Sequence, residues 1–279
     1  MPHTAIPVNG FPLNIIHPVH EHTSGSLVAF THALALAYQS HGEIEIIDIR
    51  DKGEAFESPS VRAVLEKWGL LPPNSERGDV QKIGLRVTKI VKNGNARKVI
   101  TGRMEKRPHD LLVIGTHERH GLGSLFGQDL AEYLADAFRQ TTLYVPANGR
   151  SFVNPDTGAV VLNRILIPVP DTEFAQAAFS FCKKLLSIFP QAKPEIIGLH
   201  CGESFPSLPG PLVEGLSLRT VVSADPVVPA IAAAARENVA DLVIMATEGR
   251  NTFSKKVVGS NTEQVLHQSV CPVLSIPLE

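Results

Sequence analysis

The residues best suited to chemistry lie near the C-terminus, where two glycines and a serine follow an apolar run. The run DLVIMA ends at Ala246, and Gly249, Gly259 and Ser260 come after it, the last two opening a helical pattern. Glycines let backbone N–H groups approach phosphate oxygens, and the free N–H groups at a helix start favour negative charge. The Ser260 hydroxyl is a further donor. The pattern predicts an anion-binding loop, and a plain strand end and helix start is the alternative.

A second group of chemically capable residues consists of histidines in the N-terminal half. His17, His20 and His22 come after the first apolar run, and His117 and His120 come after a later one. If these runs are neighbouring strands, the imidazoles converge, and neutral imidazoles bind zinc or another borderline divalent ion. The spacing matches no established metal motif, so scattered surface histidines are the competing interpretation.

The elements that must hold these residues occur twice along the chain. NIIHPV from Asn14 resembles RILIPV from Arg164, and DLLVIG from Asp110 resembles DLVIMA from Asp241. Each is an apolar run followed by a polar break and a helical pattern, which predicts strand, loop and helix. Continuous apolar strands that alternate with helices predict a parallel sheet covered on both faces. We therefore expect two tandem α/β domains, residues 1–148 and 163–279, joined by a linker over residues 149–162 that is rich in Gly, Asn and Pro.

The first repeat is longer than the second between its second and third strands. The additional segment covers residues around 53–80 and carries a helical pattern that ends at Trp68 and Gly69. The sequence predicts this extra helix and assigns it no function.

The C-terminal loop makes the chain resemble the universal stress protein family. ATP-binding members of that family carry Gly-x2-Gly-x9-Gly-Ser/Thr at this place, and this sequence reads Ala246-x2-Gly249-x9-Gly259-Ser260. The closing CPVLSIP is also similar to the usual ending of the family. The resemblance covers nearly the whole chain as two copies. It implies that each copy is a doubly wound parallel sheet of strand order 3-2-1-4-5, adenine nucleotide alpha hydrolase-like, with ligands at the switch point of the sheet.

The resemblance further implies that the second domain binds an adenine nucleotide, ATP or AMP. Family members place adenine and ribose against the loop after the first strand and phosphates against the glycine loop. The site residues expected here are Pro168, Pro170, Asp171, Met245, Ala246, Gly249, Arg250, Gly259, Ser260 and Asn261.

Two departures from the family pattern affect this expected site. Pro170 stands where the family has an acidic residue, with Asp171 one step later. Glu248 adds a negative charge within the phosphate loop, which costs affinity for phosphate unless a nearby Arg or Lys compensates. An inherited but empty loop is therefore the alternative to nucleotide binding.

The loop of the first domain departs further. Glu118 stands where Gly249 stands in the second copy, Gln128 replaces the serine, and the loop is one residue shorter. We expect that this domain does not bind ATP in the way of the family. His20, His22, His117 and His120 make a divalent metal such as zinc the other ligand to consider there.

Composition excludes several classes of protein. A formal net charge of −2 gives no general attraction to nucleic acid or anionic membrane, and no apolar run approaches the length of about 20 residues that crosses a bilayer. The three cysteines, Cys182, Cys201 and Cys271, are widely spaced and form no CxxC pair, which argues against a disulfide framework. We expect a cytoplasmic protein without nucleic acid or membrane partners.

The function expected from these features is nucleotide binding coupled to association, with weak ATPase activity at most. No established catalytic motif is present. Because family members pair through their last strands, TTLYVP and PVLSIP should join the two domains as an internal pseudo-dimer, and two chains could form a homodimer. We expect a universal stress protein that acts by regulated association in stress response. A slow nucleotide hydrolase or phosphotransferase and a ligand-free interaction module remain as alternatives.

Overall fold

One ten-stranded sheet runs through the molecule, in the order β3-β2-β1-β4-β5-β10-β9-β6-β7-β8. The computed structural model describes residues 11–19, 24–50, 60–116, 139–248 and 261–278. The described elements of the first half are β1 (Asn14–Val19), α1 (Ser24–Gln39), β2 (Glu43–Arg50), α2 (Val61–Lys67), α3 (Arg77–Lys82), β3 (Arg86–Asn93), α4 (Ala96–Met104), β4 (Leu111–Thr116) and β5 (Thr142–Pro146). Those of the second half are β6 (Arg164–Pro168), α6 (Thr172–Ile188), β7 (Glu195–Cys201), α7 (Gly210–Val213), β8 (Ser217–Ser223), α8 (Val227–Glu237), β9 (Leu242–Thr247), α9 (Asn261–Gln268) and β10 (Val273–Pro277).

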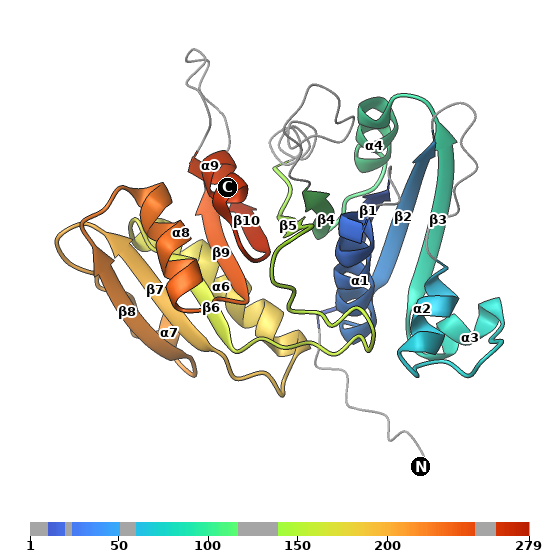
Figure 1. Ribbon diagram of the computed structural model, residues 1–279, viewed down its shortest axis with the longest axis horizontal. Helices are drawn as coiled ribbons and strands as arrows, with labels where there is room; N and C mark the ends of the chain where they lie inside the picture. Colours follow the sequence, from blue (N-terminus) through green and yellow to red (C-terminus); the bar gives the residue numbers. More distant parts are fainter. Residues whose placement is uncertain (1–10, 20–23, 51–59, 117–138, 249–260, 279) are drawn as a thin grey trace.

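Each half contributes five strands in the order 3-2-1-4-5, which confirms the predicted fold. Strands within a half are parallel, whereas β5 and β10 pair antiparallel through Leu143 opposite Leu274 and Thr142 opposite Ser275. The closing strands of the two repeats therefore join the halves within one chain, as the resemblance described above implies. Figure 1 shows the two halves side by side, the first in blue to green and the second in yellow to red.

Helices cover both faces of this sheet because its strands are apolar on both sides. In β2, Ile44 and Ile46 pack in the core beside α1, while Ile47 and Ile49 pack against α4 on the opposite face. Residues of α1 and α6 belong to one continuous core that spans both halves. In the second half, α8 and α9 pack on the other face. The sheet is thus the middle layer of three.

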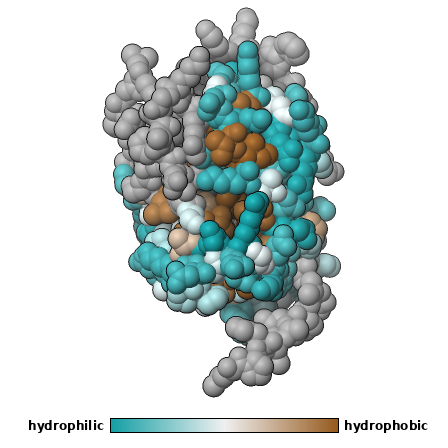
Figure 2. Space-filling view, turned by 90° about the vertical axis from the view of Figure 1, so that its right-hand side faces the viewer, coloured by the Kyte–Doolittle hydropathy of each residue, from teal (hydrophilic) through white to brown (hydrophobic). Residues whose placement is uncertain are grey.

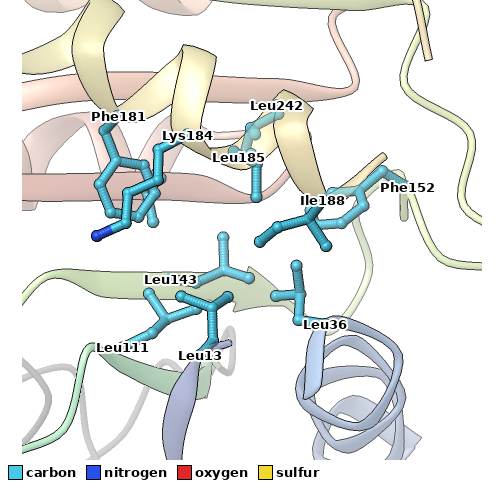
Figure 3. A pocket seen from close by; sticks show the side chains of 11 residues that line it. Leu13, Leu36, Leu111, Leu143, Phe152, Phe181, Lys184, Leu185, Ile188 and Leu242 are labelled. Carbon is cyan, nitrogen blue, oxygen red and sulfur yellow. The ribbon is translucent and has the colours of Figure 1, made fainter. Parts of the chain in front are cut away.

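The junction between the halves is apolar and tightly packed. Phe181, Leu185 and Ile188 of α6 face leucines of the first half, among them Leu36 and Leu143 (Figure 3). The space left between them measures about 10 Å³, which is at the lower limit for one water molecule. Close packing of this kind holds the two halves as one body.

The extra segment of the first half packs against the segment that connects the two domains. Trp68 caps α2, and its indole Nε1 donates a hydrogen bond to the Pro155 carbonyl at 3.1 Å. The same ring lies directly over Gly158, where an added Cβ would come within 2.5 Å of two ring carbons. Phe152 and Val153 of the connecting segment are fully buried. The extra helix therefore fixes the path of this segment.

The connecting segment also touches both domains through polar contacts. Arg150 donates to the carbonyls of Ala235 in α8 and of Ala240 after it, at 2.8 and 3.1 Å. The Ser151 hydroxyl lies 3.3 Å from Nε2 of His32 in α1. These contacts bind one short stretch of chain to elements of both halves.

A charged cluster lies in the first half between β2 and α4. Glu45 is fully buried and accepts hydrogen bonds from Nε and Nη2 of Arg103, while Arg107 forms a two-pronged pair with Glu43 at 2.8 and 2.9 Å. The hydrogen bonds from Arg107 are the main cause that holds the pKa of Glu43 below its usual range. Buried carboxylates need such partners, because an unpaired buried charge is strongly destabilising.

Strand β3 is an edge of the described sheet and carries basic side chains. Arg86, Lys89 and Lys92 occur at every third position, among apolar residues such as Val91, which is 45% exposed. Figure 2 views the molecule from this side and shows hydrophobic surface set among hydrophilic side chains. Charged side chains on an edge strand oppose pairing with another sheet. Within the described ranges, none of the helices has the length and apolar character required to cross a membrane.

Candidate functional site

A cleft of about 450 Å³ opens in the second half where β6, β7 and β9 end. These are the carboxyl ends of parallel strands at the point where the strand order reverses, with β7 on one side of β6 and β9 on the other. Ligands of doubly wound α/β folds bind at this position. The first turns of α6, which follows β6, of α9, which follows β9, and of α8, which precedes β9, complete the walls. All lining residues are Pro168, Val169, Pro170, Phe174, Leu199, Cys201, Val227, Ile231, Met245, Ala246, Thr247, Glu248, Asn261 and Thr262.

The structure brings together the described residues that the sequence assigns to a nucleotide, with one exception. Pro168 and Pro170 lie at the end of β6, Met245 and Ala246 in β9, and Asn261 at the start of α9, all around this cleft. Predicted site residues Gly249, Arg250, Gly259 and Ser260 lie outside the described residues, between β9 and α9. The two ends of the predicted phosphate loop therefore both line the cleft.

Asp171 is the exception, because it does not line the cleft. Its Oδ1 accepts hydrogen bonds from the backbone N–H groups of Glu173 and Phe174, at 2.9 and 3.1 Å. These contacts make it the N-cap of α6. Its carboxylate thus satisfies N–H groups that the helix start would leave unpaired.

His200 fixes the backbone at the bottom of the cleft. Its Nδ1 donates to the carbonyl of Val169 at 2.7 Å, and the Val169 N–H donates to the Leu199 carbonyl at 2.7 Å. The imidazole packs edge to face with Phe205. The chain that leaves β6 is therefore held against the end of β7 from two sides.

The apolar walls of the cleft were not anticipated from the sequence. Phe174 comes from the first turn of α6, Val227 and Ile231 from α8, and Leu199 from β7. The spacing of Val227 and Ile231 places both on one face of a helix, and Phe174 follows the loop already assigned to the site. These signals exist in the sequence, but only the strand order shows that the three helix starts meet at one place.

Cys201, also missed as a site residue, is the only one of the three cysteines that is partly exposed. It lines the cleft, whereas Cys182 and Cys271 are fully buried. Burial, together with the nearby negative charge of Asp225, raises the pKa of the Cys201 thiol. Burial raises the pKa of Cys182 to about 12.

The predicted metal ligands His20, His22, His117 and His120 all lie outside the described residues. His17, grouped with them in the sequence, lies within β1 and is fully buried, with its Nδ1 donating to the Val113 carbonyl at 2.9 Å. Burial lowers the pKa of His17 to about 4. Across the part of the chain that the structure describes, no three His, Cys, Asp or Glu side chains are grouped so as to hold a metal ion.

Comparison with known proteins agrees with the fold and with the two repeats. The model of the universal stress protein family matches residues 14–146 and 213–277. A universal stress protein from Archaeoglobus fulgidus has a similar structure, with a TM-score of 0.62 and 16% identity over 95% of this chain and 96% of that chain. No curated protein sequence matches the chain.

Two further solved structures are similar over 95% of this chain. A functionally unknown protein from Pseudomonas aeruginosa has a TM-score of 0.57 and 14% identity, over 93% of its own length. The cytoplasmic domain of a prokaryotic cation chloride cotransporter has a TM-score of 0.51 and 10% identity, over 95% of its length. Identities this low show a common fold and nothing more. Since the family model covers most of the sequence in two segments, the chain belongs to the universal stress protein family and carries its domain in tandem.

Proposed function

We propose that the cleft of the second domain binds an adenine nucleotide and that the protein acts by nucleotide-regulated association in the stress response, in the cytoplasm. The observation that carries this proposal is the position of the cleft at the carboxyl ends of β6 and β9, between the two ends of the predicted phosphate loop. That position is where nucleotides bind in this class of sheet. Its volume of about 450 Å³ lies within the range of small-molecule sites.

The residues that line the cleft suit the binding of a planar base. Phe174, Leu199 and Ile231 give the cleft an apolar interior, while Thr247, Asn261 and Thr262 supply polar groups at the end where α9 begins. An aromatic base gains from leaving water for such surroundings, and the polar end suits a ribose or a phosphate. The arrangement therefore fits a ligand with one apolar and one polar part.

Association without catalysis fits the described side chains better than hydrolysis. Asp171 was the candidate for positioning a water at a phosphate, and its Oδ1 is engaged in capping α6. Efficient phosphoryl transfer requires charge stabilisation at the transferred group as well as a positioned nucleophile. We therefore propose that phosphate release stays at background and that Asp171→Asn leaves it there.

The test is a titration of the full chain with AMP and with ATP by calorimetry. Val227 lines the cleft and is 41% exposed, so Val227→Trp should obstruct the cleft and weaken binding at least tenfold. Val222→Trp is the matched control, because Val222 is 46% exposed on β8 and does not line the cleft. Binding of neither nucleotide to the wild-type chain at millimolar concentration refutes the proposal.

A further inference from the structure

The charge in the described part of the cleft is negative. Glu248 follows β9, lines the cleft and is exposed, and it is the charged side chain among the described lining residues. Asp225 lies close enough to act on the Cys201 thiol, on the opposite wall at the end of β7. These positions place one carboxylate at the polar end of the cleft and a second near Cys201.

Glu248 shares the polar end of the cleft with Asn261 and Thr262, which begin α9. A ligand whose base lies among Phe174 and Ile231 would direct its phosphates toward this end, because the other walls are apolar. Each phosphate added to the ligand brings further negative charge toward the Glu248 carboxylate, and like charges at such distances repel. The base and ribose carry no charge and are unaffected.

We propose that this cleft prefers an adenine nucleoside or its monophosphate to the triphosphate, with Glu248 as the specificity-determining residue. The proposal rests on the adenine-binding function proposed above and narrows its ligand class. Two additional phosphate charges close to one carboxylate weaken binding on the order of tenfold. AMP should therefore bind about tenfold more tightly than ATP when no divalent cation is present.

The experiment is a calorimetric titration of the full chain with adenosine, AMP and ATP in the presence of a chelator. Glu248→Gln removes the negative charge and keeps the side chain nearly the same shape. It should raise the affinity for ATP about tenfold and change the affinity for adenosine less than about twofold. Glu214→Gln is the matched control, because Glu214 is an exposed glutamate after α7 that does not line the cleft. The control should leave all three affinities unchanged.

The outcomes separate this proposal from the one on which it rests. If no adenine ligand binds, the proposed function itself fails. If the ligands bind but ATP is as tight as AMP, or Glu248→Gln leaves the ratio unchanged, the preference for low charge is wrong and basic residues of the loop neutralise Glu248. The titration is then repeated with magnesium. If magnesium raises the affinity for ATP and Glu248→Gln abolishes this gain, Glu248 holds a cation for the triphosphate and the proposal is refuted.

Discussion

Replacing Gly158 by alanine should destabilise the protein through the contact between the extra helix and the connecting segment. Gly158 has a φ of 69°, in the left-handed region, and an added Cβ would lie 2.5 Å from Cδ2 and Cε3 of Trp68. The indole cannot move away freely, since it is 9% exposed and its Nε1 is bonded to Pro155. Alanine in the left-handed region costs about 1–2 kcal/mol, and overpacking adds about 1–3 kcal/mol.

Gly69 provides a control with the same backbone conformation. Its φ is 70°, and nothing lies within 4 Å of an added Cβ. Gly69→Ala should therefore lower the free energy of unfolding only by the cost of the left-handed backbone conformation, about 1–2 kcal/mol. The difference between the two variants then isolates the packing of residue 158 against Trp68.

Urea unfolding gives the free energy of unfolding of both variants. Tryptophan fluorescence serves as the signal, because Trp68 is the single tryptophan of the chain. Gly158→Ala should lose about 1–3 kcal/mol more than Gly69→Ala. In a Trp68→Ala background, followed by circular dichroism, that excess should disappear. Equal losses from the two glycine variants would refute the reasoning, because they would mean that the connecting segment does not rest on Trp68.

Three further predictions concern stability. Burial lowers the pKa of both His17 and His32 in the folded protein to about 4, so the unfolded chain binds more protons between about pH 6.5 and 4. The urea concentration at the unfolding midpoint should therefore fall as the pH drops through this range, and His32→Gln should make this fall smaller. Arg103→Met should cost about 3 kcal/mol, because it removes two hydrogen bonds from the fully buried Glu45 carboxylate. The double variant Arg103→Met/Glu45→Met should recover much of that loss in the same assay, whereas an unchanged loss would contradict the account of the charged pair. Leu143→Ala, at the junction of the halves, should cost about 3 kcal/mol in one cooperative transition, and separate melting of two halves would show that they are not one body.

The fold could be predicted from local patterns because they repeat. The apolar runs at Asn14 and Arg164 read as buried parallel strands, and the structure has β1 and β6 there. Pairing of β5 with β10 followed from the family resemblance and is confirmed. The ion pair of Glu45 and Arg103 could not be predicted, because the two residues are 58 positions apart in the sequence. The alternating Glu and Ile residues of β2 are instead typical of a half-exposed strand.

The site could be predicted only in part. Pro168 and Ala246 were assigned from the family resemblance, and both line the cleft because β6 and β9 flank the switch point. Asp171 was assigned to a ligand, although a polar residue before Thr-Glu at a helix start is also a typical N-cap, and its Oδ1 caps α6. Val227 was missed because its place in the cleft depends on how α8 packs against the sheet, which no sequence spacing specifies.

The measurement that tests the central claim most directly is protection of Cys201 from alkylation. Because Cys182 and Cys271 are buried, a maleimide should label one thiol rapidly in the native protein, at mildly alkaline pH since the pKa of Cys201 is raised. If an adenine ligand occupies the cleft that Cys201 lines, saturating AMP should slow this labelling at least tenfold and leave labelling in urea unchanged. A native labelling rate that AMP does not alter would contradict the claim that this cleft is the adenine site.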